Sequence, residues 1–272
     1  GGNGADTTDN TLNVKTNAAA ANIKNFENLA FYVNSSALNA ANPMLTLSSG
    51  ATNNLDWRNL TVDASKFSGT ISTFEPYNLV LMQNAAGISF MKGTDDTYTL
   101  GGGVKSTTSG DFEFTIDTSS HGVSTTQVTA AGYKFKNHEA SYSEATPHTE
   151  AWAGRTAAGN KVEKNTLTVT GGSVTNAYGG FVVNNKRDAS GNPLTTGDAD
   201  SNTLILAKDA ANPSAAAPAV TGSAYGALVK TKAGSATNNK VDFSAGHVAG
   251  SLYGGALTAT GATGAATGNT IT

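Results

Sequence analysis

Apolar and polar residues alternate with a period of two in several short stretches spread along the chain. The clearest of these stretches are residues 11–14, 44–47, 111–117 and 132–136. Such alternation predicts β-strands that bury one face and expose the other. No stretch approaches the run of about 20 apolar residues that a membrane-spanning helix needs. The pattern therefore predicts an all-β protein.

From about residue 150 onward, two short motifs follow each other in strict alternation. The first is an Asn that opens an alternating strand, at Asn165, Asn202 and Asn239, with a fourth start at Asn269. The second is an aromatic residue followed by Gly or Ala, at Tyr178, Tyr225 and Tyr253, with an earlier copy at Trp152. Most half-repeats span 13 to 16 residues, so one unit spans about 27–30 residues over 150–272. Short strands repeated at this period predict one turn of a solenoid.

Two half-repeats are longer than the others by about ten residues. The extra residues are 186–198 and 208–219, which are polar or small and contain Pro. Insertions of this composition predict loops that protrude from the surface.

Stacked turns bring equivalent residues together. We expect Leu167, Leu204 and Val241 to line up along one axis, because each turn can bury them only against its neighbours. The same stacking would join Asn165, Asn202 and Asn239 into an amide ladder, and Tyr178, Tyr225 and Tyr253 into a column of rings. We therefore assign these six residues a structural role.

Residues from about 75 to 140 show alternation without the repeat. Half-exposed alternating strands favour antiparallel hairpins, so we expect a hairpin-rich insertion or subdomain here. The fold predicted for 1–272 is one parallel β-solenoid that carries this insertion and the two protruding loops.

Composition excludes some classes of protein. Only 14% of the 272 residues are charged, the net charge is -3, and there is no Cys. The sequence has no basic stripe of the kind that binds nucleic acid. The absence of Cys is normal for a protein that crosses a periplasm unfolded. A surface rich in hydroxyl and amide groups is typical of an exposed protein. Because the chain opens with Gly1-Gly2-Asn3-Gly4, which is no signal peptide, and ends on the first strand of another repeat at Asn269, we expect both ends to be cut from a longer protein.

Three stretches in the N-terminal part, taken in order, carry a resemblance to a known family: Asp9–Val14, Ile23–Val33 and Met44–Leu47. Together with the Tyr-Gly units, they resemble haemagglutinin-like passenger domains of type V autotransporter adhesins of Gram-negative bacteria such as fusobacteria and veillonellae. The two regions cover somewhat more than half of the chain, and the region from about 75 to 140 matches only loosely.

The resemblance implies a right-handed parallel β-helix at the bacterial cell surface, exported and anchored by an outer-membrane barrel that lies outside this sequence. It implies virulence-related attachment to host cells or to other bacteria, through protein or glycan receptors. It carries over no catalytic residue, no metal and no cofactor, so we expect a binding protein and not an enzyme.

Exposed aromatic residues are the candidates for binding, because sugars and protein hot spots both use them. The candidates are Trp57 with its neighbour Arg58, Tyr98 and Tyr142. The alternative for each is packing beneath a loop, since large aromatic side chains are mostly buried.

Other polar groups are weaker candidates. Gly1–Asp6 matches a single copy of a calcium-binding repeat, but such sites need tandem copies. The densest titratable cluster is His138, Glu139, Glu144, His148 and Glu150. It could form a metal or acid–base site, but it lacks a metal-binding spacing and is more typical of a solvated loop. His121 and His247 stand alone.

Two other functions compete with adhesion. A β-helix polysaccharide lyase or hydrolase would need paired carboxylates on neighbouring strands. Here Asp95, Asp96, Asp198 and Asp200 lie in turn-like sequence, and Asp242 is the single carboxylate in the strand repeats. A structural stalk would present a featureless surface. An adhesin would bind through its loops and the 75–140 insertion.

Overall fold

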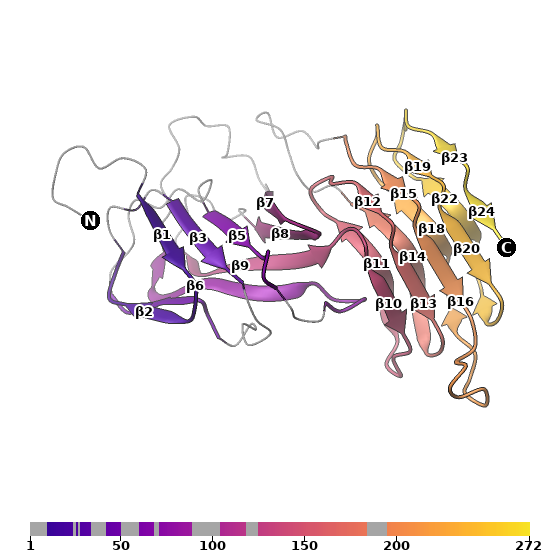
Figure 1. Cartoon of the computed structure of the whole chain (residues 1–272), viewed down its shortest axis with the longest axis horizontal. Coiled ribbons are helices and arrows are strands. Elements are labelled where there is room, and N and C mark those ends of the chain that lie inside the picture. The colour runs from indigo at the N-terminus through magenta and orange to yellow at the C-terminus, as the bar shows by residue number, and fades with distance from the viewer. Residues whose placement is uncertain are drawn as a thin grey trace. The chain divides into compact units, whose positions relative to one another are not determined.

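The computed structural model describes residues 10–23, 26, 28–33, 42–49, 60–67, 71–88, 104–117, 125–183 and 195–272. Within these ranges the regular elements are all β-strands, so the all-β prediction is confirmed (Figure 1). The chain forms two compact units. The N-terminal unit holds residues 1–70, 77–132 and 186–192, and the C-terminal unit holds 71–76, 133–185 and 193–272.

Three parallel sheets build the C-terminal unit, and each receives a strand or a pair of short strands from every repeat. The first sheet contains β10 (Glu139–Tyr142), β13 (Thr166–Val169), β16 (Thr203–Leu206), β20 (Lys240–Phe243) and β24 (Thr270–Ile271). The second contains β11 (His148–Thr156), β14 (Ser173–Val182), β17 (Ala219–Val220), β18 (Ala224–Val229), β21 (His247–Val248) and β22 (Leu252–Leu257). The third contains β12 (Val162–Glu163), β15 (Ala199–Asp200), β19 (Ala236–Thr237) and β23 (Ala266–Thr267).

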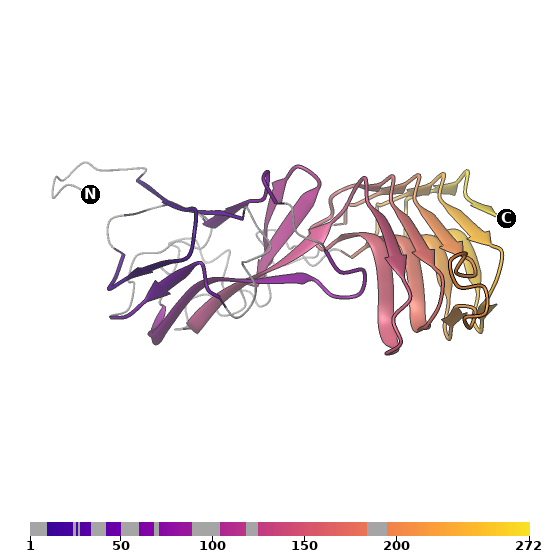
Figure 2. The same cartoon turned by 60° about the horizontal axis from the view of Figure 1, so that its bottom comes forward.

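The repeats stack in register. In the first sheet Leu167 pairs with Leu204, and Leu204 pairs with Val241. Figure 2 shows the strands of successive repeats following one another along the unit. All three side chains are fully buried, and each contributes roughly 1.5–3 kcal/mol by leaving water. The predicted alignment of these positions is confirmed.

Small residues on the inner face of the second sheet let it approach the first sheet closely. Ala151, Ala177 and Ala224 are fully buried there. Gly179 lies so close to the next repeat that a Cβ would stand 2.6 Å from the backbone of Thr203. A larger side chain at this position would push the two sheets apart.

One turn recurs between the third sheet and the first. Its residues with positive φ are Asn137, Lys164, Ser201 and Asn238 at 53–56°, and Gly268 at 66°. The residues that follow Lys164, Ser201 and Asn238 are Asn165, Asn202 and Asn239, which are all fully buried. The left-handed conformation costs a non-Gly residue roughly 1–2 kcal/mol, so the surrounding contacts must hold it in place.

The repeat boundaries differ from the prediction. Repeats begin at β10, before residue 150, because β10 pairs with β13 in the register of the later strands. The second predicted insertion ends at 218, since Ala219 and Val220 form β17 and pair with β14. The first predicted insertion lies mostly outside the described residues.

The N-terminal unit also contains stacked parallel strands, although no regular period was visible in its sequence. One sheet contains β1 (Thr11–Val14), β3 (Asn28–Tyr32) and β5 (Leu60–Asp63). The other begins with β2 (Ala18–Ala20), β4 (Leu45–Leu47) and β6 (Tyr77–Ile88), also parallel. It continues with β9 (Thr125–Lys134), β8 (Phe112–Asp117) and β7 (Val104–Ser109).

The antiparallel pairs lie where they were predicted, between residues 75 and 140. β6 pairs antiparallel with β9, and β7 pairs antiparallel with β8. They do not form a subdomain of their own. Residues 77–132 belong to the same compact unit as residues 1–70, and their apolar side chains enter one shared core.

Candidate functional site

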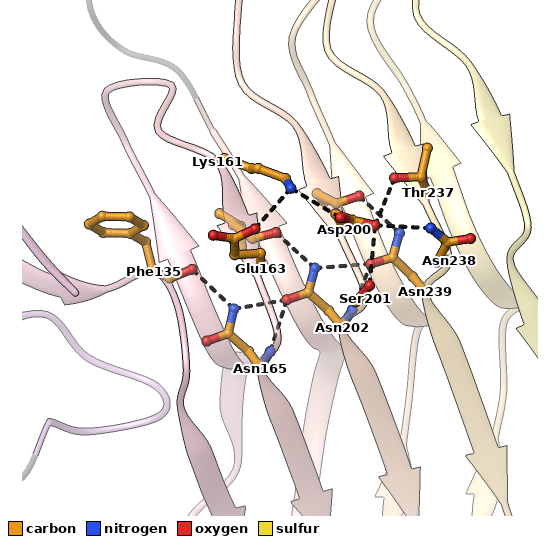
Figure 3. A network of polar contacts seen from close by, with 12 residues as sticks. Phe135, Lys161, Glu163, Asn165, Asp200, Ser201, Asn202, Thr237, Asn238 and Asn239 are labelled. Carbon is orange, nitrogen blue, oxygen red and sulfur yellow. Dashed lines mark hydrogen bonds and ion pairs between the residues drawn. The ribbon is translucent and has the colours of Figure 1, made fainter. Parts of the chain in front are cut away.

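A ladder of buried Asn side chains follows the recurring turn (Figure 3). Asn202 Nδ2 donates to Asn239 Oδ1 at 2.9 Å and to the Val162 carbonyl at 3.0 Å. Asn202 Oδ1 accepts from the side chain of Asn165 at 2.8 Å and from its backbone N–H at 3.2 Å. Asn165, Asn202 and Asn239 are fully buried, so the predicted amide ladder exists and is structural.

At the first copy of the recurring turn, His138 stands at the position that Asn occupies in the later copies. Its backbone N–H donates to Asn165 Oδ1 at 3.1 Å, and its Nδ1 lies 2.7 Å from the Ala153 carbonyl oxygen. Because a carbonyl oxygen only accepts, Nδ1 carries the proton. Burial lowers the pKa of His138, and the bond to Ala153 only partly opposes this. His138 therefore belongs to the core and is not part of a solvated loop.

The remaining members of the predicted titratable cluster are dispersed. Glu139 is exposed on β10, and the ring of His148 stacks on Phe74 with centroids 3.8 Å apart. Glu150 contacts Arg155 at 3.4 Å. Across the residues that the structure describes, no three His, Asp or Glu side chains gather as a metal-binding group.

A second polar network lies beside the ladder, around β12 and β15. Lys161 Nζ contacts Glu163 Oε2 at 2.8 Å and Asp200 Oδ2 at 3.0 Å. Asp200 Oδ1 accepts from Thr237 Oγ1 at 3.0 Å and from Asn238 Nδ2 at 3.2 Å. Figure 3 shows these residues gathered over neighbouring strands of the third sheet.

This network overturns one sequence prediction. Asp200 is not in a turn: it lies in β15 and pairs directly with Glu163 of β12. Neighbouring strands therefore do present paired carboxylates. The alignment of Asn165 with Asn202 implies this pair, since each carboxylate lies two residues before its Asn, but both strands are only two residues long and show no alternation.

The electrostatics of Asp200 do not suit a general acid. Partial burial raises the pKa of Asp200, but hydrogen bonds from Lys161, Asn238 and Thr237 outweigh it and hold the pKa at about 2. Hydrogen bonds to Glu163 and Asp200 in turn raise the pKa of Lys161. A general acid needs a raised carboxyl pKa. Asp200 instead stays ionised and accepts hydrogen bonds from Lys161, Thr237 and Asn238.

The predicted column of Tyr rings runs along the second sheet. Tyr178 and Tyr225 have ring centroids 5.2 Å apart, and Tyr225 and Tyr253 have centroids 5.0 Å apart, with nearly parallel planes. Phe181 also stacks on Tyr178 at 4.3 Å. Tyr178 is 2% exposed and Tyr253 is 40% exposed. Because the rings face each other, the column is structural and offers mainly its edges to a ligand.

Arg155 lies against several aromatic rings, including Phe181, which stacks on Tyr178 of the column. Its guanidinium carbon lies 4.5 Å from the centroid of Trp152, 5.0 Å from that of Tyr133 and 5.3 Å from that of Phe181. Its buried Nε has no hydrogen-bond partner. Stacking between a guanidinium and aromatic rings compensates part of that cost.

Of the four predicted binding residues, the structure describes only Tyr142. Tyr142 is 1% exposed, and its hydroxyl donates to the Ser173 carbonyl at 2.8 Å. The prediction that Tyr142 is an exposed binding residue is therefore wrong, because its ring is packed in the core. Trp57, Arg58 and Tyr98 lie outside the described residues. So do His121, Asp95, Asp96 and Gly1–Asp6, whereas His247 is exposed on β21.

A groove in the N-terminal unit was not foreseen. It has a volume of about 190 Å³ and is lined by Lys15, Tyr32, Val33, Asp63, Ser65 and Lys66. These residues lie at or just after the carboxyl ends of β1, β3 and β5. In-register parallel pairing brings these three strand ends together. The alternation that the three strands share is the sequence feature that could have predicted the groove. The unequal spacing of the strands along the chain hid their alignment.

Comparison with known proteins identifies no relative: no family model, no curated protein and no solved structure matches the chain. A search of the described residues for a helix long and apolar enough to cross a membrane found none.

Proposed function

We propose that this chain is part of the passenger of a type V-secreted bacterial surface adhesin, whose C-terminal unit is a right-handed parallel β-solenoid. It acts at the cell surface by binding protein or glycan receptors on host cells or on other bacteria. The three in-register parallel sheets support the solenoid. The resemblance of the N-terminal stretches and the Tyr-Gly units supports the adhesin.

One observation carries the proposal of a binding role: the difference between connections at one corner of the repeats. The first and second sheets are joined by three residues in two repeats, at 170–172 and 244–246. Between β16 and β17 the connection is residues 207–218, the orange loop beyond β16 in Figure 1. A rigid stack that presents a longer loop is a common arrangement for recognition.

The loop has internal order. The Ala215 N–H donates to the Asn212 carbonyl at 2.9 Å, and Ser214 Oγ donates to Asn212 Oδ1 at 2.9 Å. The Ala211 N–H donates to Asp209 Oδ1 at 2.9 Å. Residues 210–214 are exposed. A loop already held in one conformation loses less entropy when it binds a partner.

The repeats themselves provide the test. Replacing residues 207–218 with Thr-Gly-Gly, the sequence of 170–172, would install a connection already used in the same stack. The fold should survive, because Gly172 and Pro218 occupy equivalent places, bonded to Ala219 and His247 respectively. We expect the exchanged protein to keep its circular dichroism spectrum and to lose binding to host epithelial cells and to a glycan array.

A matched control is the double variant Lys240→Ala, Asp242→Ala, which removes a solvent-exposed ion pair elsewhere on the stack. Such pairs contribute little to stability, so this variant should fold and bind like the parent. Absence of binding by the parent chain, or equal binding after the loop exchange, would refute the proposed role of the loop.

The second candidate is a polysaccharide-processing enzyme, and the neighbouring carboxylates of Glu163 and Asp200 are the observation in its favour. The low pKa of Asp200 would suit only the nucleophile or base of such an enzyme, so Glu163 would have to be its general acid. Incubation with neutral and acidic polysaccharides, followed by reducing-end and ultraviolet assays, separates the two functions. Degradation that disappears in Glu163→Gln would replace the adhesin proposal with the enzyme.

A further inference from the structure

The groove of the N-terminal unit combines two cations with an aromatic ring. Lys15 and Lys66 are exposed, and Tyr32 is partly buried. The Nζ of Lys15 lies 5.6 Å from the centroid of the Tyr32 ring, over its face. With one carboxylate, Asp63, the lining of the groove carries a net charge of +1. The groove therefore attracts an anionic group to a place beside an aromatic side chain.

Asp63 adds a fixed acceptor to the same groove. Its Oδ1 accepts from the Ser65 backbone N–H at 2.8 Å and from Ser109 Oγ at 3.2 Å. Hydrogen bonds from Ser65 lower the pKa of Asp63 and outweigh the opposing effect of burial, with smaller help from Ser109 and the charge of Lys66. An oriented, ionised carboxylate accepts hydrogen bonds from hydroxyl groups.

The size of the groove limits the ligand. Pockets for drug-sized molecules span roughly 300–1,000 Å³. About 190 Å³ is smaller, so the groove fits one ring with its substituents. Val33 contributes a buried apolar side chain to the lining. The required ligand is thus a single ring that bears an anionic group, hydroxyl donors and an apolar face.

We propose that this groove binds one carboxylate-bearing sugar residue, with its carboxylate at Lys15 and Lys66 and its hydroxyl groups at Asp63 and Ser65. Tyr32 contributes ring surface and a hydroxyl. The inference names a ligand class for the proposed adhesin and depends on that function for its biological setting. The groove belongs to the N-terminal unit, and the 207–218 loop belongs to the C-terminal unit.

The test uses the full chain and isothermal titration with glucuronate, glucose and acetate. Glucuronate has the ring, the hydroxyls and the carboxylate, whereas each of the other two lacks a part of the set. We expect glucuronate to bind at least about tenfold more tightly than either, since one charge-assisted hydrogen bond contributes roughly 1.5–3 kcal/mol. Equal binding of glucose would overturn the role of the charge.

Two variants locate the binding. Lys66→Gln and Lys15→Gln each remove one cation from an exposed side chain, so both should fold, and each should weaken glucuronate binding about tenfold. Lys232→Gln removes the same charge from an exposed position in the C-terminal unit and should leave binding unchanged. Equal losses in all three variants would show a nonspecific charge effect and would refute the site.

A peptide ligand is the alternative outcome. If N-acetyl-aspartate amide binds as tightly as glucuronate, the groove recognises acidic peptides and the sugar class is wrong. The titration does not involve cells. Failure of glucuronate binding would refute this site alone, whereas unchanged cell binding after the 207–218 exchange would refute the proposed binding loop alone.

Discussion

Asn202→Ala should be among the most destabilising single changes in the C-terminal unit. The side chain is fully buried and makes four hydrogen bonds: two to Asn165, one to Val162 and one to Asn239. Each buried bond contributes about 1 kcal/mol net, and partners left unsatisfied cost more. We expect the free energy of unfolding to fall by about 4 kcal/mol.

Asn269→Ala is the matched control, because Asn269 is the last member of the same ladder. It accepts from Asn239 at 2.9 and 3.1 Å and donates to Ala236 at 2.8 Å, but it is partly exposed. Water can replace the lost partners there, so the cost should be only about 1 kcal/mol.

The assay is urea unfolding followed by tryptophan fluorescence. The chain has two Trp residues, so a Trp57→Phe background leaves Trp152, which is buried in the C-terminal unit, as the single reporter. Equal losses of stability for Asn202→Ala and Asn269→Ala would refute the reasoning. That result would mean that the buried amide ladder contributes no more than a surface hydrogen bond.

Three further predictions concern the same unit. Because the pKa of Asp200 is held at about 2, below the usual 3.8, its stabilisation is complete above pH 4 and is lost as the pH falls through 2. In Asp200→Asn, the urea concentration at the unfolding midpoint should therefore change less between pH 4 and pH 2 than in the parent. Gly179→Ala should lower stability by more than about 2 kcal/mol in urea, whereas Gly171→Ala, whose Cβ would meet nothing closer than 3.7 Å, should be neutral. Tyr178→Ala should cost about 3–5 kcal/mol and Tyr253→Ala about 1, because only Tyr178 is buried; equal melting temperatures would contradict the stacked column.

The repeat was readable from the sequence because it depends on local patterns. A strand opened by Asn and a corner opened by Tyr recur in order, and stacking requires like residues at like positions. Leu167, Leu204 and the Tyr column were located in this way. The N-terminal unit has the same parallel pairing, but its strand spacings differ so much that no period was visible.

The candidate sites were less readable. Tyr142 looks like a surface aromatic in a polar stretch, yet it is packed in the core beside Phe74, with ring centroids 6.1 Å apart. Local polarity could not show which side of the strand faces the core. The groove residues Lys15, Tyr32 and Asp63 are up to 48 residues apart in the sequence and meet only because three strands align.

By itself, the sequence determined the all-β class, the repeating unit and the residues that stack, because those depend on alternation and period. Only the tertiary structure decided which residues form the short strands of the third sheet and which charged side chains meet there. Glu163 and Asp200 are 37 positions apart, and the register of two short strands brings them together beneath Lys161. The alignment of Asn165 with Asn202 implies this register, because each carboxylate lies two residues before its Asn. The contacts with Lys161 depend on how the chain folds between the sheets, and no local pattern of side chains contains that.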